Sequence, residues 1–221
     1  MVTRVVSVLA RQAPASAVGA VLGAAVLVGF IGGGVLGSLT LLGDVGGDDQ
    51  SEAVLPAEPD RSEAALTVVS ASCEREPAVD SAFNRVEYKA EFAVNGDPET
   101  AWQCRGDGVG ETLVLDLGGT FAVSAVGLIP GYTKVDPHDG TDWYPLNRRL
   151  TEVRWHLDDD STVEQVLDPD PALRDVQMVE LDDPVEATTL TLEIVSSVPG
   201  SSEAHPNIAV SEIHITTAGG A

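Results

Sequence analysis

The sequence has few positive charges. Its 221 residues include 12 lysine and arginine residues against 35 aspartate and glutamate residues, which gives a formal net charge of −23 at pH 7. Proteins that bind DNA or RNA need clusters of lysine and arginine to neutralise phosphates. The composition excludes such a surface, so we expect no nucleic-acid partner. The length allows one domain of ordinary size and additional segments.

Acidic residues are absent from the N-terminal part of the chain. No charge occurs between Arg11 and Asp44, and residues 17–43 are almost entirely Ala, Val, Leu, Ile, Phe and Gly. A helix of about 20 apolar residues crosses the hydrocarbon core of a bilayer, whereas the apolar region of a secretory signal peptide spans about 7–15 residues. We therefore predict a transmembrane helix at residues 17–43, with a cleaved signal peptide as the alternative.

The charges on either side of this apolar run predict its orientation. Arg4 and Arg11 precede it, and Asp44 follows it. By the positive-inside rule, we expect a protein of the cell membrane whose residues 1–16 are cytoplasmic and whose residues after Gly43 are extracytoplasmic. The outer part carries all 35 acidic residues and ten of the 12 basic ones, a net charge of −25 that disfavours contact between the domain and anionic lipids. Three glycines share one helix face and would allow a homodimer through this helix: Gly29, Gly33 and Gly37.

Beyond the apolar run, the chain divides into a linker and a domain. Residues 44–65 are acidic and rich in Gly and Pro, which predicts a disordered linker; residues 66–217 form the domain and 218–221 a tail. β-branched residues and period-two alternation predict a strand in each of eight segments: Leu66–Ser70, Thr112–Leu117, Phe121–Ile129, Thr151–Leu157, Thr162–Leu167, Val176–Leu181, Thr188–Val195 and Val210–Thr216. With only a short helical turn expected near 90–93, the pattern predicts an all-β antiparallel sandwich or jelly roll.

The sequence contains two cysteines. Cys73 and Cys104 both lie in the predicted outer part, where thiols meet an oxidising environment, so we predict a disulfide. It would stabilise the fold by about 3–4 kcal/mol in the chain-entropy model. Two unpaired buried cysteines are the alternative, because spacing does not show whether the Cβ atoms meet. The histidines lack the paired spacing of a zinc site.

No motif of an enzyme is present. The glycines at Gly106, Gly108 and Gly110 precede a predicted strand and not a helix, which is typical of a turn and not of a phosphate-binding loop. Acidic residues are so numerous that pairs of carboxylates carry no information about catalysis. We therefore predict that the protein is not an enzyme, with a hydrolase that works through surface carboxylates as an alternative.

Aromatic and basic side chains gather between Gly131 and Leu150, although aromatic residues make up only 5% of the chain. Aromatic faces stack on sugar rings, and Asn, Arg and His side chains hydrogen-bond to hydroxyl groups, so the cluster favours a carbohydrate ligand. The alternative is that Trp143 and Tyr144 close the end of the sandwich and the arginines pair with carboxylates. The candidate ligand-binding residues are Tyr132, Lys134, His138, Trp143, Asn147 and Arg149.

Several short motifs resemble one family. Residues 92–102, with Asn95-Gly96 followed by Thr100 and Trp102, resemble the Asp-Gly-x-x-x-Thr-x-Trp signature of discoidin-like (F5/8 type C, galactose-binding-like) domains, with Asn95 in place of the more usual Asp. Four later motifs are similar to the translocation, or glycan-binding, domain of streptococcal NAD glycohydrolase: Gly108-x-Gly110-Glu111, Gly131-Tyr132-x-Lys134, Asn147-x-Arg149 and Ser211-Glu212-Ile213. The resemblance covers roughly residues 66–216 and does not extend to the glycohydrolase catalytic domain.

This resemblance implies a galactose-binding-like sandwich and a structural calcium ion, which many carbohydrate-binding members of the family hold near the signature turn. The implied ligands are Asn95, Asp97, Thr100 and Glu212. Only Asp97 and Glu212 are charged, so we expect weak binding, with a dissociation constant of about 10⁻⁴–10⁻³ M. The alternative is that residues 95–98 are simply a turn built from residues that turns favour. We expect no other cofactor.

These observations together predict a single-pass membrane protein that displays a non-enzymatic binding module. The resemblance also extends to domains of bacterial membrane proteins with an N-terminal anchor. The predicted ligand is carbohydrate of the cell surface or envelope. The alternative partner is a protein of the envelope.

Overall fold

The computed structural model of the protein describes residues 5–6 and 61–218. The predicted transmembrane helix at residues 17–43 lies outside this part, as do most of the predicted cytoplasmic segment and linker. No helix in the described residues is long and apolar enough to cross a membrane.

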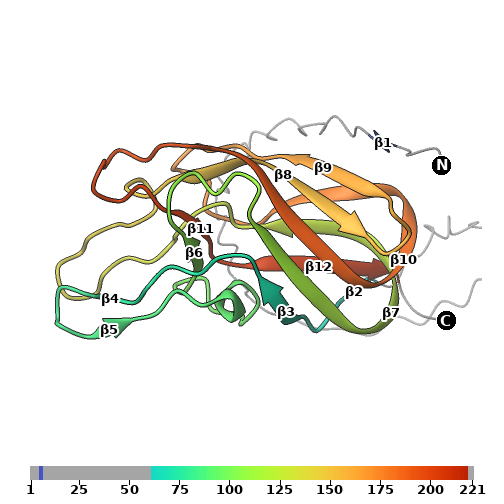
Figure 1. The fold of residues 1–221 in the computed structure, drawn as a ribbon, viewed down its shortest axis with the longest axis horizontal. Coiled ribbons are helices and arrows are strands. Elements are labelled where there is room, and N and C mark those ends of the chain that lie inside the picture. The colour runs from blue at the N-terminus through green and yellow to red at the C-terminus, as the bar shows by residue number, and fades with distance from the viewer. Residues whose placement is uncertain (1–4, 7–60, 219–221) are drawn as a thin grey trace, which may run out of the picture. The chain divides into compact units, whose positions relative to one another are not determined.

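The described residues form twelve β-strands and one short 3-10 helix (Figure 1). The predicted helical turn is confirmed as the helix η1 (Ala90–Ala93). The strands are β1 (Val5–Val6), β2 (Arg61–Glu63), β3 (Thr67–Ala71), β4 (Ala78–Val79), β5 (Arg85–Val86), β6 (Trp102–Cys104), β7 (Thr112–Leu128), β8 (Arg149–Leu157), β9 (Thr162–Val166), β10 (Gln177–Val198), β11 (Ile208–Val210) and β12 (Ile213–Ala218).

Two long strands, β7 and β10, run through both layers of the sandwich. They pair antiparallel along most of their lengths, with register shifts between Glu180 and Val185 and between Ala187 and Thr189. Each of the two strands also has a second neighbour. The C-terminal part of β10 pairs with β8, which in turn pairs with β9, whereas the C-terminal part of β7 pairs with β12. β-bulges bend strands and increase their twist, which allows one strand to serve two layers.

This continuity differs from the expected boundaries. The sequence predicted two strands at 112–117 and 121–129, but both belong to β7, and the two strands predicted at 176–181 and 188–195 both belong to β10. Gly118, whose φ is +73°, marks a bend in β7 and not its end, because β10 pairs with the residues on both sides. The predicted all-β antiparallel sandwich is otherwise confirmed.

Five smaller pairings complete the topology. β3 pairs antiparallel with the N-terminal part of β7, and β2, which lies within the predicted linker, pairs antiparallel with β12. β4 and β5 form a hairpin, and β6 pairs antiparallel with β11. These four strands lie toward the end of the molecule opposite the bends of β7 and β10 (Figure 1). β1 pairs in parallel with β9, through Val5 with Thr162 and Val6 with Val163.

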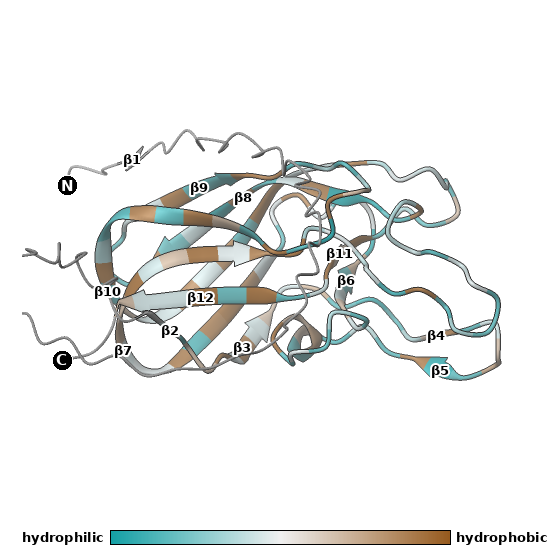
Figure 2. Ribbon diagram, turned by 180° about the vertical axis from the view of Figure 1, so that it is seen from behind, coloured by the Kyte–Doolittle hydropathy of each residue, from teal (hydrophilic) through white to brown (hydrophobic). Residues whose placement is uncertain are grey.

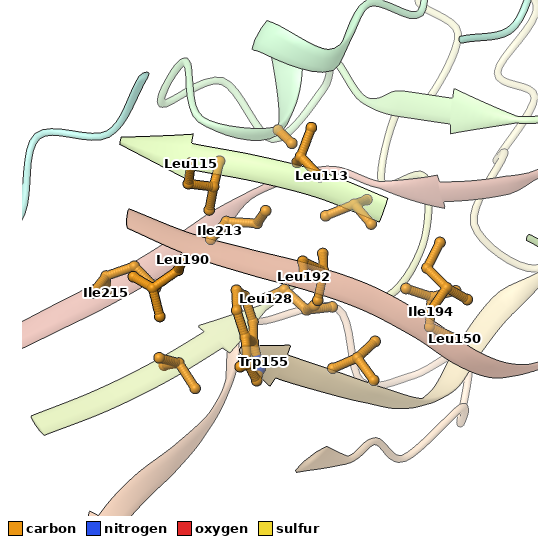
Figure 3. Packing of buried hydrophobic residues seen from close by; sticks show 14 of the residues in the cluster. Leu113, Leu115, Leu128, Leu150, Trp155, Leu190, Leu192, Ile194, Ile213 and Ile215 are labelled. Carbon is orange, nitrogen blue, oxygen red and sulfur yellow. The ribbon is translucent and has the colours of Figure 1, made fainter. Parts of the chain in front are cut away.

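The core lies between the two layers. Hydrophobic and hydrophilic residues alternate along β7 and β10 (Figure 2), so that one face of each strand is buried. Trp155 of β8 is fully buried among leucines and isoleucines of β7, β10 and β12 (Figure 3), and its indole N–H donates a hydrogen bond to Gln165 Oε1 at 2.9 Å. Burying each such aliphatic side chain stabilises the fold by about 1.5–3 kcal/mol.

The predicted disulfide is present. Cys73 and Cys104 are bonded, with 5.7 Å between their Cα atoms, and the bond connects the segment after β3 to β6. The buried indole of Trp102 donates a hydrogen bond to the carbonyl of Cys73 at 2.8 Å. The disulfide and this bond hold the start of the segment that leads to the β4–β5 hairpin.

Candidate functional site

A pocket of about 120 Å³ lies where the β4–β5 hairpin meets two loops, residues 129–148 and 199–207. Four of the predicted ligand-binding residues line it: Tyr132, Lys134, Trp143 and Asn147. The principal residues that the sequence analysis did not single out are Arg75, Tyr88 and His205.

The loop 129–148 is held in place by packing and by an ion pair. Tyr144 is fully buried, and its hydroxyl donates to the carbonyl of Leu173 at 2.8 Å. Its ring lies so close to Gly131 that a Cβ there would approach Tyr144 Cε2 to 2.5 Å, so only glycine fits. Arg174 donates to both carboxylate oxygens of Asp142, next to Trp143. These contacts hold the backbone on both sides of Trp143, whose partly buried side chain packs against a small cluster that includes Tyr88 and Tyr132.

Two pairs of rings form the aromatic part of the pocket. Trp143 and His205 meet edge to face, with ring centroids 4.9 Å apart, and Tyr88 and Tyr132 do so at 6.2 Å. The guanidinium of Arg75 lies over the Tyr88 ring, 4.3 Å from its centroid, and Arg75 Nη1 donates to Gln103 Oε1 at 2.7 Å. Arg75 makes no ion pair with the described residues, although the domain is rich in carboxylates.

Asn147 lines the pocket, and its side-chain carbonyl oxygen is buried without a partner in the described part of the chain. Its side chain is 2% exposed, and its Nδ2 donates to the carbonyl of Trp143 at 3.0 Å. Its Oδ1 accepts no hydrogen bond from the residues that the structure describes. A buried polar atom without a partner is unfavourable by about 1–3 kcal/mol, so this oxygen is an acceptor whose hydrogen bond the described residues do not supply.

Burial and neighbouring groups shift the pKa values of several side chains that line the pocket. Burial and the nearby Arg75 charge lower the pKa of His205, which keeps the imidazole neutral at pH 7. Burial raises the pKa of Tyr132, so its hydroxyl stays protonated. The backbone N–H of His138 and the hydroxyl of Ser81 hydrogen-bond to Asp136 and lower the pKa of that carboxyl.

Two predicted ligand-binding residues lie outside the pocket lining. His138 is exposed, and its backbone N–H is bonded to Asp136. Arg149 is 8% exposed and is bonded to the protein itself. Its guanidinium donates to four carbonyls, those of Pro169, Tyr144, Pro145 and Asn147, at 2.7–3.3 Å. Arg149 therefore holds together the base of the loop, while Trp143 lines the pocket and Tyr144 is buried against Gly131.

The signature turn is closed by its own hydrogen bonds. Asn95 Oδ1 accepts from the backbone N–H of Asp97 at 3.0 Å and from the Thr100 hydroxyl at 3.2 Å. Asp97 Oδ1 accepts from the backbone N–H of Glu99 at 3.0 Å. Gly96 between them has a φ of +75°, which glycine adopts without strain.

Glu212 lies beside this turn, as the resemblance implied. It is 6% exposed; burial raises the pKa of its carboxyl, while a hydrogen bond with the Gly96 backbone opposes the rise. Its Oε2 has no partner among the described residues, so it fits a hard cation. Asn95 and Thr100 are hydrogen-bonded to each other, and the described residues contain no group of three or more His, Cys, Asp or Glu residues able to hold a metal ion.

Residues 64–216 match the model of the NAD glycohydrolase translocation F5/8 type C domain. The chain belongs to this family. No match was found among curated proteins. The translocation-domain match covers all the strands from β3 to β11 and the first four residues of β12.

The solved structures most similar to this translocation-type domain include carbohydrate-binding modules of Clostridium perfringens. The family 32 module of NanJ, determined in complex with galactose, is 17% identical with a TM-score of 0.50, over 71% of this chain and 99% of the module. Another, CpGH89CBM32-5 in complex with GalNAc-β-1,3-galactose, is 18% identical with a TM-score of 0.49, over 70% and 99%. The similarity to the NanJ module supports the galactose-binding-like sandwich.

The motifs that carry the family resemblance converge in the translocation-type domain. The hydroxyl of Thr133, within the Gly131–Lys134 motif, donates to the carbonyl of Pro98 in the signature turn. The backbone N–H of Thr133 donates to Ser211 Oγ at 3.2 Å, in the closing motif. One residue thus connects the turn, the pocket loop and the segment before β12.

The residues missed by the sequence analysis come from distant segments. Arg75 follows the disulfide cysteine Cys73 by two residues, and His205 precedes β11. Neither stands within a periodic pattern or a cluster of similar residues, so no local signal marks it. Arg75 could have been sought only through the disulfide, which brings the segment after β3 next to β6.

Proposed function

We propose that this protein is a membrane-anchored, extracytoplasmic binding module for carbohydrate of the cell surface or envelope. The convergence of aromatic rings, Trp143 among them, with the polar side chains of Asn147 and His205 in one pocket is the observation that carries the proposal. A sugar has an apolar ring face that stacks on an indole. It also has hydroxyl groups that form hydrogen bonds with amide and imidazole side chains.

The other polar groups of the pocket suit hydroxyl groups as well. Arg75 has guanidinium donors beyond the one bonded to Gln103. His205 is neutral at pH 7, so its ring provides one donor and one acceptor. The family 32 module of NanJ was determined with galactose, which is consistent with a hexose as the bound unit. We assign carbohydrate as the ligand class on the chemistry of these side chains.

The carboxyl groups of the pocket favour binding over hydrolysis. Glycosidases require a carboxylic acid whose pKa is raised so that it stays protonated and acts as a general acid. Asp80 and Asp136 line the pocket, but hydrogen bonds from neighbouring groups lower the pKa of both. They stay ionised at neutral pH, and we propose that bound carbohydrate is not cleaved.

A glycan array tests this function. The full-length protein in detergent is applied to an array of mono- to tetrasaccharides, beside the variants Trp143→Ala and Asn147→Ala. We expect the wild-type protein to bind a defined subset and both variants to lose it. A wild-type protein that binds no glycan but captures one envelope protein would favour the alternative partner and overturn the carbohydrate proposal.

The membrane anchor is proposed from hydropathy and charge. Thirty-two uncharged residues separate Arg11 from Asp44, which supports a span with the N-terminus in the cytoplasm. Glycines 29, 33 and 37 would let two such helices pack as a homodimer.

Protease accessibility tests the proposed topology of the anchor. Protease added to intact cells should release a fragment that begins near residue 60, while a tag placed before Met1 stays protected. Protection of residues 61–218 would contradict the extracytoplasmic location. In a membrane two-hybrid assay, Gly33→Ile should reduce self-association if the glycines form the helix contact; an unchanged signal would remove the homodimer.

A further inference from the structure

Exposed apolar side chains occur on the hairpin and on the loop that border the pocket. Phe83, at the tip of the β4–β5 hairpin, is 89% exposed, and Val79 of the same hairpin is 65% exposed. Val135, on the loop 129–148, is 44% exposed and stands between Lys134 and Asp136, which both line the pocket. Single exposed apolar residues are ordinary on protein surfaces, but these three lie on the two segments that border one pocket.

The hairpin tip is held rigidly to the pocket. Asp80, a lining residue, accepts hydrogen bonds at its Oδ1 from the backbone N–H of Ala82 at 3.0 Å and of Asn84 at 2.7 Å. The backbone N–H of Phe83 donates to the carbonyl of Asp80 at 3.1 Å. The Ser81 hydroxyl donates to Asp136 Oδ1 at 3.0 Å, which joins the hairpin to the opposite loop. Phe83 lies two residues from Ser81, within roughly 7 Å along the chain.

The backbone of Phe83 is in the left-handed region, with a φ of +65°. This conformation is unfavourable for a bulky side chain and is favoured by glycine or asparagine. Neither burial nor packing explains a phenylalanine at this position, because its side chain is almost fully in solvent. A contact made by the ring outside the folded chain would explain it.

The hairpin borders the pocket directly, because Val79, Asp80 and Val86 line it. A ligand longer than one sugar that left the pocket on this side would run along the hairpin, past Val79 and toward Phe83 at its tip.

We infer that Phe83 forms an outer stacking subsite, so that the site reads an oligosaccharide and not a single sugar. The inference rests on the proposed carbohydrate function and extends it: Trp143, Asn147 and His205 hold the inner sugar, and the Phe83 ring packs on the C–H face of the next one. A phenylalanine ring has no polar group, so this subsite contributes affinity and tolerates different sugars at the second position.

A lipid or protein partner fits the exposed residues Val79, Phe83 and Val135 less well. The outer part of the chain carries a net charge of −25, which repels the anionic headgroups that an inserted hairpin would meet. The exposed apolar residues are also too few for the core of a stable protein interface, which buries about 800 Å² on each partner. A neutral oligosaccharide meets neither obstacle.

Phe83→Gly is the informative variant, because glycine adopts the observed φ without strain and should leave the melting temperature unchanged or higher. The full-length protein and its variants are titrated with mono-, di- and trisaccharides that share one terminal sugar, chosen from the glycans that the wild-type array binds. We expect Phe83→Gly to weaken di- and trisaccharide binding about three- to tenfold while the monosaccharide affinity stays constant. Phe83→Trp should keep the preference for di- and trisaccharides over the monosaccharide, because tryptophan also offers a ring for stacking. Phe121→Ser changes a second exposed phenylalanine, outside the pocket lining, and should not affect binding.

The outcomes separate the two proposals. A wild-type protein that binds no glycan overturns the proposed function and this inference with it. Unchanged oligosaccharide affinity in Phe83→Gly, or an equal loss for mono- and oligosaccharides, overturns the outer subsite and leaves the carbohydrate function standing. Binding of the wild-type protein to phosphatidylcholine vesicles that is lost in Phe83→Gly would instead assign the hairpin tip to a lipid surface.

Discussion

The indole of Trp143 and the imidazole of His205 meet edge to face, with an interplanar angle of 88°. The two residues come from different loops, and each is partly exposed in the pocket. Their contact closes one side of a site whose other side is formed by Arg75 and Tyr88 near the β4–β5 hairpin. The geometry of the pocket therefore depends on how three separate segments are held, and the predictions below concern those attachments.

Trp143 and the adjacent Tyr144 should behave differently when each is changed to alanine. Trp143 is partly exposed, so Trp143→Ala should abolish glycan binding and lower the free energy of unfolding by less than about 2 kcal/mol. Tyr144 is fully buried, so Tyr144→Ala should lower it by about 3–5 kcal/mol. Urea unfolding and glycan titration measure both effects. A loss of 3 kcal/mol or more in Trp143→Ala would place that residue in the core and not in the site.

Glycan affinity should depend on the protonation of His205. Burial and the charge of Arg75 lower its pKa below the ordinary value of 6.5, so the ring is neutral at pH 7 and gains a proton only in more acidic solution. Affinity should be constant above about pH 6.5 and fall as the pH drops through the lowered pKa. The free energy of unfolding should also fall as the pH drops, because the unfolded chain binds this proton more readily than the folded one.

Calorimetric titrations between about pH 5 and pH 8 measure this dependence. His205→Gln should bind more weakly but without the acid-dependent loss. His156→Gln is the control, because His156 lies on β8 and bonds to Glu193, outside the pocket lining. A His205→Gln variant that retains the full pH dependence would assign the loss to another group.

Arg149 should affect stability more than contacts with the ligand. Arg149→Ala removes a buried guanidinium that donates to four carbonyls, so we expect the free energy of unfolding to fall by about 2–4 kcal/mol. Arg149→Lys should restore little, because an ammonium group does not reproduce the planar set of donors. Arg105→Ala, at an exposed turn, should change stability by less than about 0.5 kcal/mol. Equal stabilities of Arg149→Ala and the wild-type protein in urea would contradict this assignment.

Calcium should stabilise the domain if Glu212 and Asp97 hold an ion. Millimolar calcium should then raise the melting temperature relative to EDTA, and Glu212→Gln or Asp97→Ala should remove the rise. Because burial raises the pKa of Glu212, protons should compete and the calcium effect should weaken in acid. Identical melting temperatures of the wild-type protein in calcium and in EDTA would show that the turn holds no ion.

The sequence by itself determined the fold class, and it predicted the disulfide that the structure then confirmed. Period-two alternation in segments such as 189–194 reflects one buried and one exposed face, a local property that needs no knowledge of the partner strand. Strand continuity was not determined in this way: Gly118 ends a hydrophobic run, but pairing with β10 extends β7 through the bend. With two cysteines in the outer part, Cys73 and Cys104 had one possible intrachain pairing.

Only the tertiary structure decided which polar residues form the pocket. Composition marked the loop that contains Trp143 and Asn147, but it did not separate them from Arg149, whose guanidinium turns inward to backbone carbonyls. Arg75 and His205 are 130 positions apart in the sequence and reach one pocket because the disulfide, β6 and β11 bring their segments together. Alternation is a local consequence of burial, whereas convergence on a pocket depends on long-range pairing, which no local pattern encodes.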